Sequence, residues 1–189
     1  TQLRFPDPSL GIDPALGGTQ RPARIAGRDL GRWAVLAGNF MNAETATDLG
    51  LVTHLVDIND VPNCIKGIHT SGKPENKYPG KPMNENSPVV KFAKKFFSDG
   101  NMAALLAGSC PDGFDAEDKT VARQLKSLKF TAPIGLAMAS ERIDATASMS
   151  LDEGLLLELQ GLDRIFSTED ALEGLSALIE GRRATYKNA

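Results

Sequence analysis

The sequence predicts an α+β fold in which most of the chain is helical. The chain has 189 residues, of which 41% are hydrophobic, and this is enough for one domain with a sizeable core. From residue 87 onward, apolar residues recur at the three- and four-residue spacing of helix faces, behind residues that cap helices. Residues 51–56, LVTHLV, form the one short apolar run that reads as a strand.

Composition excludes several classes of function. The chain carries 24 acidic and 21 basic residues, so a field that attracts nucleic acid is not expected. No apolar run has the length of a bilayer span, and the first residues lack the pattern of a signal peptide. Cys64 and Cys110 are far apart, and His54 and His69 are too few for a histidine-rich metal site. We expect a cytoplasmic protein with no metal, nucleic-acid or membrane partner.

Residues 1–26 are rich in Pro and Gly and are expected to be irregular at residues 5–8 and 17–18. A segment of this kind resembles the lining of a site whose other walls lie elsewhere. Asp7 stands between Pro6 and Pro8, which stiffen its backbone. A carboxylate on a stiff loop is a candidate general acid or base, although an aspartate of a surface turn is the plain alternative.

Residues 27–56 predict a helix, a short helix and then a buried strand. The first helix places Leu30 and Trp33 on one face. Asn42 is expected to cap the short helix, and Gly50 to end it. His54 lies in the predicted strand, where a hydrogen-bonded core or edge residue is the expected role.

Residues 67–88 are predicted to form a long loop, since Pro and Gly recur through them. Four lysines accompany this loop, at Lys66, Lys73, Lys77 and Lys81. Two interpretations stay open. The segment is either a solvated surface excursion or a basic flap over a ligand that bears phosphate.

The rest of the chain predicts five helices and their caps. Ser87 and Pro88 begin the first helix, and Asp115 and Thr131 are expected to cap the next two. Residues 150–153, SLDE, read as a capping box. The last two helices are expected to turn their leucines inward, or toward a partner subunit: Leu155, Leu156, Leu159 and Leu162 on one, and Leu172, Leu175, Leu178 and Ile179 on the other.

The last helix is expected to start at Ser167 or Thr168. Arg182 and Arg183 follow its C-terminal end, where cations complement the helix dipole.

The order of three motifs resembles the crotonase (enoyl-CoA hydratase/isomerase) superfamily. Residues 5–21 read FPDPSLGIDPALGGTQR, against the family's PE-x-x-LGI-x-P-x-x-GGTQR. Residues 43–52 read AETATDLGLV, against A-x-x-A-x-x-x-GLV. Residues 166–182 read FSTEDALEGLSALIEGR, against F-x-T-x-DA-x-EG-x-x-AF-x-E-x-R. The resemblance covers both ends of the chain.

The resemblance implies three regions along the chain. Residues 1–66 correspond to the end of the family's repeated strand–helix spiral, and residues 115–189 to its helical trimerisation domain. Residues 67–114 are expected to be an insertion, which looks like that of archaeal-type proteins in which a 3-hydroxyacyl-CoA dehydrogenase is fused to a crotonase module. The family's front half, with the oxyanion-hole donors and the first catalytic Glu, has no counterpart here. The resemblance therefore implies the C-terminal part of a longer enzyme that is inactive alone.

The resemblance carries two site residues onto this sequence. Asp7 stands at the place of the family's second catalytic Glu, and its side chain is one methylene shorter. Lys187 falls near the basic C-terminal position that contacts coenzyme A, while Leu178 stands where an aromatic residue is common. For the cations of residues 182–187, complementarity to the helix end is the alternative role.

The implied reaction is hydration of a 2-enoyl-CoA to the 3-hydroxyacyl-CoA. Expected partners are the acyl-CoA substrate, the missing front half and further copies in a trimer or hexamer. No cofactor is implied in this chain; the coenzyme A thioester is substrate, and NAD belongs only to a fused dehydrogenase. Isomerase or acyl-CoA hydrolase activity stays open, because one scaffold hosts these reactions. A non-catalytic oligomerisation module is the alternative from another class.

Overall fold

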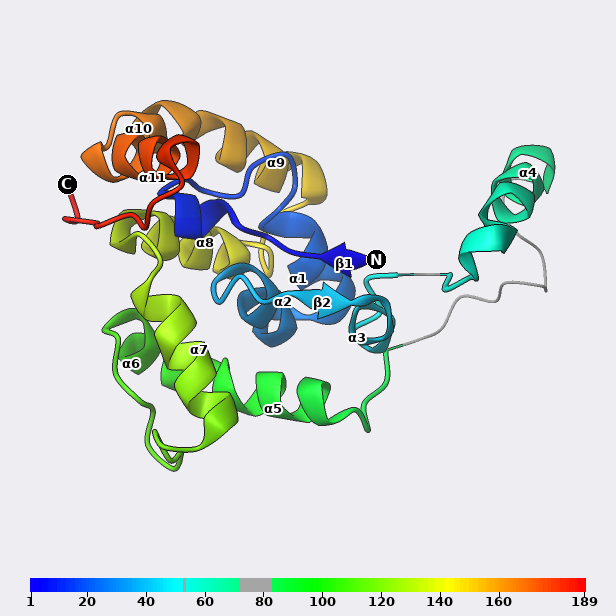
Figure 1. Cartoon of the computed structure of the whole chain (residues 1–189), viewed down its shortest axis with the longest axis horizontal. Coiled ribbons are helices and arrows are strands. Elements are labelled where there is room, and N and C mark those ends of the chain that lie inside the picture. Colours follow the sequence, from blue (N-terminus) through cyan, green and yellow to red (C-terminus); the bar gives the residue numbers. More distant parts are fainter. Residues whose placement is uncertain (53, 72–82) are drawn as a thin grey trace.

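The structure is a computed structural model that describes residues 1–52, 54–71 and 83–189. Within these residues it is mostly helical, which confirms the coarse prediction (Figure 1). Two short strands, β1 (Gln2–Leu3) and β2 (Met41–Asn42), pair antiparallel with Gln2 opposite Asn42. The sequence analysis did not predict either strand, since a run of two residues carries no periodicity.

Helix α2 (Arg28–Val35) lies at the centre of the fold and packs against α1 (Gln20–Ala26), α5 (Pro88–Phe96) and α8 (Pro133–Ala145). The chain reaches α1 through the 3₁₀ helix η1 (Asp7–Leu10). Gly31 lets α1 and α2 approach, because a Cβ at this position would lie 2.8 Å from the Cα of Ala23. The core that results is continuous from α1 to α8.

Helix α3 (Ala43–Asp48) confirms the predicted short helix. The side chain of Asn42 accepts a hydrogen bond from the backbone N–H of Thr45 at 2.8 Å. Gly50 follows with a φ of +73°, the left-handed conformation that glycine adopts without strain.

The strand predicted over residues 51–56 is wrong for the five of them that are described. Residues 51, 52 and 54–56 are not in a strand, and Leu55 is 45% exposed. The chain here leaves the body of the molecule (Figure 1) toward η2 (Ile58–Asp60) and α4 (Val61–Ser71). The run therefore has no neighbouring strand in the described structure, and hydrophobic character alone does not supply one.

Helix α4 also corrects the predicted loop, because residues 67–71 are helical. It runs without a break from residue 66 to residue 67, where the sequence analysis placed the start of the insertion. Lys73, Lys77 and Lys81, which define the predicted basic loop, lie outside the described residues.

Two predicted caps are corrected after α5, where η3 (Asp99–Asn101), α6 (Met102–Leu106) and α7 (Lys119–Lys129) follow. Asp118, not Asp115, caps α7 by accepting from the N–H groups of Thr120 and Val121. Asp115 instead accepts from Glu117 in a turn before the helix. Thr131 donates its hydroxyl to the carbonyl of Ser127, so it closes α7 rather than opening α8.

The last helices are α9 (Leu151–Gln160), α10 (Leu162–Phe166) and α11 (Glu169–Glu180). The capping box at Ser150 and Glu153 is confirmed, and so is the cap at Thr168. The inward face of α9 is different from the predicted one: Gly154 and Glu158 are buried, while Leu156 and Leu159 are exposed. On α11, Leu172, Leu178 and Ile179 are likewise exposed.

The described helices include none whose length and hydropathy would suit a membrane span. Among the described residues, no three His, Cys, Asp or Glu side chains are grouped as they would be around a metal ion.

Candidate functional site

Asp7 is the first residue of η1, a turn that the flanking prolines pre-set. The turn ends at Gly11, whose φ of +76° is left-handed and whose N–H points back to the carbonyls of Asp7 and Pro8. The Asp7 side chain is half-buried, and it forms no hydrogen bond or ion pair with a described residue. The carboxylate is therefore held on a stiff backbone but keeps its acceptor positions open.

The Asp7 side chain lines a cavity of about 410 Å³, within the usual size range of small-molecule sites. The wall is mostly apolar and comes from β1, the 14–18 turn, α1, β2 and Leu51: Leu3, Phe5, Pro14, Ala15, Leu16, Gly17, Gly18, Pro22, Ile25, Met41 and Leu51. Arg21 is the cation of the wall and donates to the carbonyl of Leu16. One carboxylate and one guanidinium thus face an otherwise apolar space.

Helix α11 fixes the position of η1 from one side. A Cβ on Gly174 would lie 2.1 Å from the carbonyl oxygen of Leu10, and a Cβ on Gly11 would lie 2.2 Å from that of Asp170. Only glycine permits this approach at either position. The phenol of Tyr186, on the tail after α11, donates to the carbonyl of Ser9 at 2.7 Å. Burial raises the pKa of Tyr186 to about 12, so the donor stays protonated.

Glu158 of α9 fixes the 14–18 turn from the other side. Its carboxylate is 1% exposed and accepts from the N–H of Gly17 at 2.6 Å, and from the N–H and hydroxyl of Thr19 at 3.0 and 2.5 Å. A buried carboxylate requires such donors, because desolvation would otherwise be costly. Asp13, at the start of the turn, forms a buried ion pair with Arg142 of α8. The cavity wall is thereby attached to α8 and α9.

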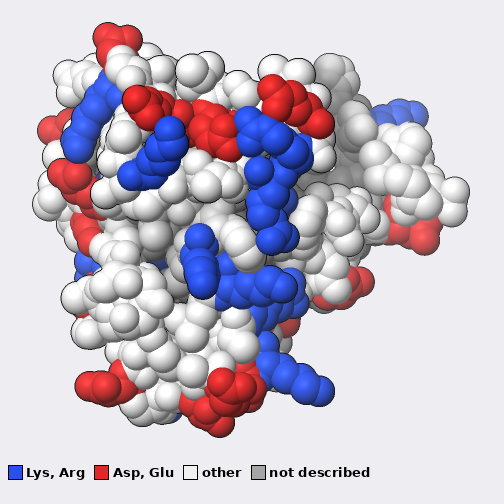
Figure 2. All heavy atoms as spheres, turned by 60° about the vertical axis from the view of Figure 1, so that its left-hand side comes forward, with Lys and Arg blue, Asp and Glu red and all other residues white. Residues whose placement is uncertain are grey.

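Lys187, the second predicted site residue, does not line the Asp7 cavity. Its side chain is 74% exposed, with the ammonium 3.9 Å from a Glu169 oxygen. Its backbone N–H donates to Asp170, which holds the tail against the start of α11. Figure 2 shows the face turned forward from the left of Figure 1, on which basic side chains run from the upper part through the middle toward the lower right, with acidic side chains beside them at the top.

The tail also places the two arginines that end the last motif. Arg182 forms a two-pronged contact with Glu173, at 2.6 and 2.8 Å, and Arg183 lies over the ring of Phe130. Both have contacts within the chain.

Sequence reasoning missed Arg21, Glu158 and Tyr186 as parts of the site. Arg21 lies inside the motif that identifies the family resemblance, but only the structure shows that it faces Asp7's cavity. Glu158 is four residues after Gly154, so the two residues lie on one face of α9. This spacing alone does not mark a site, because the backbone that this face accepts comes from distant residues.

Comparison with known proteins identifies the family of the chain. The model of the family described as enoyl-CoA hydratase/isomerase matches residues 1–187. The chain belongs to the enoyl-CoA hydratase/isomerase family. The match runs through all three motifs and through the region that carries Asp7.

Three relatives each match nearly all of this chain, whereas this chain matches only about half of each of them. The mitochondrial enoyl-CoA hydratase of Pongo abelii is 24% identical over 187 residues, which are 99% of this chain and 45% of that protein. The enoyl-CoA hydratase structure from Rhodobacter sphaeroides aligns with a TM-score of 0.77 and 25% identity, over 98% of this chain and 54% of that one. A carnitinyl-CoA dehydratase from Mycobacterium thermoresistibile has the same fold, with a TM-score of 0.73, 19% identity and 97% and 54% coverage. The chain thus spans about half the length of these three relatives.

Proposed function

We propose that this chain is part of an enoyl-CoA hydratase, which adds water to a 2-enoyl-CoA and forms the 3-hydroxyacyl-CoA. The observation that carries the proposal is the Asp7 carboxylate, unpaired among the described residues, in the wall of an apolar cavity of about 410 Å³. Its place matches that of the family's second catalytic Glu, and several relatives are named as enoyl-CoA hydratases.

In this proposal Asp7 exchanges protons during the addition. The carboxylate accepts a hydrogen bond from the attacking water and takes its proton as the oxygen bonds to C3 and the C2–C3 double bond breaks. The protonated Asp7 then returns this proton to C2, which completes the addition of water and restores the carboxylate. Leu16 and Ile25 of the apolar wall are exposed in this chain, so in this proposal the wall excludes other water once the further half covers it, and this strengthens each polar contact inside. The shorter side chain of Asp7 requires η1 to stand closer to the substrate than a Glu would, and α11 sets that position.

The catalytic apparatus is shared with a further half in this proposal. The oxyanion-hole donors and the first catalytic Glu belong to that half, and the present chain is the C-terminal part. Support comes from coverage, since the chain accounts for 45% of the Pongo abelii hydratase. The proposal includes fusion to a 3-hydroxyacyl-CoA dehydrogenase, where any NAD would bind; its support is the sequence from residue 67 onward, which resembles the insertion of archaeal-type fusion proteins. Alone, the chain is then inactive or nearly so.

Lys187 is proposed to contact the phosphates of coenzyme A. Its exposed ammonium on a tail held by Asp170 supports this role. The apolar side chains left exposed on α9 and α11 support assembly into a homo-oligomer, a trimer or a hexamer, by burying Leu159, Leu172 and Ile179 between copies.

The same exposed face favours a second candidate function, a non-catalytic oligomerisation module. In that case Asp7 is a residue of the turn and has no chemical role. Isomerase and acyl-CoA hydrolase reactions use the same scaffold and would be distinguished by their products.

The test is hydration of crotonyl-CoA by the protein together with every part that native mass spectrometry shows to accompany it. Asp7→Asn keeps the shape but removes the base, and turnover is expected to fall by about 10²-fold or more. Asp112→Asn, an exposed aspartate outside the cavity, is the control. Turnover of Asp7→Asn equal to that of the control would favour the assembly module. A hydrolysed or isomerised product in place of the 3-hydroxyacyl-CoA would show that the protein catalyses hydrolysis or isomerisation and not hydration. Hydration by the 20.2 kDa chain alone would show that no further half is needed.

A further inference from the structure

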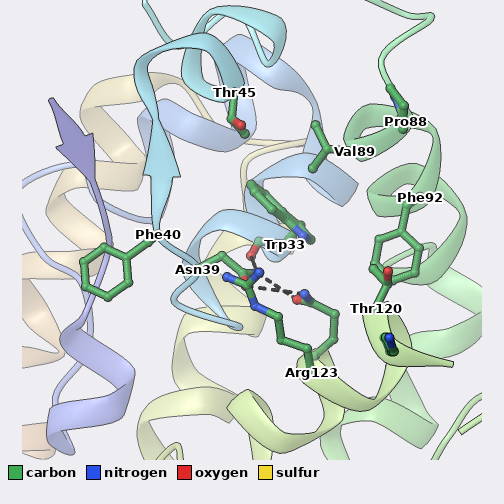
Figure 3. Close-up of a pocket in the computed structure, with 11 residues that line it drawn as sticks. Trp33, Asn39, Phe40, Thr45, Pro88, Val89, Phe92, Thr120 and Arg123 are labelled. Atoms are coloured by element: carbon green, nitrogen blue, oxygen red, sulfur yellow. Dashed lines mark hydrogen bonds between the residues drawn. The ribbon is translucent and has the colours of Figure 1, made fainter. Parts of the chain in front are cut away.

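A second cavity, of about 560 Å³, lies between α2, α3, α5 and α7. It shares no lining residue with the Asp7 cavity. Figure 3 shows that its walls come from separate parts of the chain: Trp33 from α2, Thr45 from α3, Phe92 from α5, and Thr120 and Arg123 from α7. Its volume fits a small organic molecule.

Trp33 contributes a hydrogen-bond donor to the cavity. The residue is 5% exposed, but its indole nitrogen is not among the buried polar atoms that lack a partner, so the N–H reaches the open space of the cavity. Its ring extends from α2 toward α5 and α7 (Figure 3), so the donor faces the cavity. An indole N–H donates but cannot accept a hydrogen bond. The cavity therefore offers a position where an oxygen atom of a ligand could accept from Trp33.

The floor of the cavity is rigid. The side-chain amides of Asn39 and Gln124 are both buried and bond to each other at 2.7 and 3.4 Å. Asn39 also donates to the backbone carbonyl of Trp33 at 3.3 Å. These contacts satisfy the amides and hold the loop before β2 on α7, so the shape of the cavity is fixed before a ligand binds.

The charge of the cavity is positive. Lys119 and Arg123, one turn apart on α7, both line it, and no Asp or Glu does. Neither cation forms an ion pair with an acidic group among the described residues. Two acidic residues have other partners: Asp118 caps α7, and Glu85 pairs with Lys94. An anion would find two unpaired cations here.

Phe92 and Val89 of α5 give the cavity an apolar wall. The ring of Phe92 is stacked on that of Phe96, with the ring centres 5.1 Å apart, so this wall is part of the core. A free phosphate or another small hydrated anion would leave this wall without a partner.

We propose that the second cavity binds a small amphipathic carboxylate, with the apolar body against Phe92 and Val89. The carboxylate of this ligand contacts Arg123 and Lys119 and accepts a hydrogen bond from the indole N–H of Trp33. This site is separate from the Asp7 cavity and does not depend on the proposed hydratase reaction.

The chain contains one tryptophan, so its fluorescence reports on this cavity directly. Octanoate is the probe; octanol carries the same tail without the charge, and inorganic phosphate carries charge without the tail. We expect a saturable change in Trp33 fluorescence with octanoate, at concentrations about tenfold or more below those needed for octanol or phosphate. Equal responses to octanoate and octanol, or to octanoate and phosphate, would overturn the proposal.

Variants separate the cavity from other apolar surfaces. Arg123→Gln is expected to weaken octanoate binding about tenfold, and Lys126→Gln, an exposed lysine of the same helix outside the cavity, should leave it unchanged. Trp33→Phe removes the indole donor and should weaken octanoate binding several-fold. Because this variant has no tryptophan fluorescence, its affinity for octanoate is measured by calorimetry. Unfolding midpoints equal to that of the parent chain show that the variants are folded. Folded variants that bind octanoate with the affinity of the parent chain would contradict the proposal. A Trp33 whose fluorescence is changed neither by octanoate nor by the quencher acrylamide would also contradict it, because the cavity would then be filled by another segment.

Discussion

The carboxylate of Glu158 accepts a hydrogen bond from the backbone N–H of Gly17 at 2.6 Å, across 141 positions of the sequence. The same carboxylate holds Thr19 through its N–H and its hydroxyl. These three bonds join α9 to the turn that forms a wall of the Asp7 cavity. The relationship links the helical C-terminal region to the geometry of the candidate site.

Replacing Glu158 by Ala is expected to lower the free energy of unfolding by about 3 kcal/mol, because three buried donors lose a charged acceptor. Urea denaturation measures the change. Glu141→Ala, an exposed glutamate on α8, is the control and should change stability by less than about 0.5 kcal/mol. A loss below about 1 kcal/mol for Glu158→Ala would show that the turn keeps its place without this anchor.

Gly174→Ala is expected to separate α11 from η1. The added methyl would lie 2.1 Å from the carbonyl of Leu10, and overpacking of this kind costs about 1–3 kcal/mol. Thermal unfolding gives the cost. Gly100→Ala, where a Cβ would meet nothing within 4 Å, is the matched control. If both variants unfold at the same temperature, the contact between η1 and α11 is looser than described.

Arg32 is expected to be the main residue that fastens the 97–99 segment and α8 to α2. Its side chain is 2% exposed and bonds to Asp99, Asp144 and the carbonyl of Phe97. Arg32→Gln should cost about 2 kcal/mol, measured by urea denaturation. Arg28, which meets the same two aspartates, is 35% exposed, and Arg28→Gln should cost less than about 1 kcal/mol. The reverse order of the two losses would contradict this assignment.

The C-terminal tail is expected to respond to acid through Glu173. The two bonds from Arg182, with the N–H of Thr185, lower the pKa of Glu173 from 4.5 to about 2. Folding therefore favours the ionised carboxylate. This stabilisation is present above pH 4.5 and is lost as the pH falls toward 2. An NMR titration should show the low pKa, and Arg182→Gln should return it toward 4.5. A Glu173 pKa near 4.5 in the parent chain would show that the pair does not persist in solution.

Much of the helical pattern could be predicted from local signals. The capping box at Ser150 and the cap at Thr168 were predicted because caps act on N–H groups within three residues. The helix that begins at Pro88 was predicted because proline suits the first turn of a helix, although the Ser87 side chain forms no capping hydrogen bond there. The cap of α7 was misplaced by three residues, since Asp115 and Asp118 both have the right chemistry and only the helix start decides between them.

The sequence by itself also determined the place of Asp7, because the motif and its prolines are consecutive along the chain. Only the tertiary structure decided which groups surround it. Glu158, Tyr186 and Gly174 reach the site from more than a hundred residues away, and no local pattern encodes such contacts. The buried face of α9 was decided in the same way. Gly154 admits Gln20, and Glu158 gains three donors, so these residues turn inward while Leu156 and Leu159 remain outside.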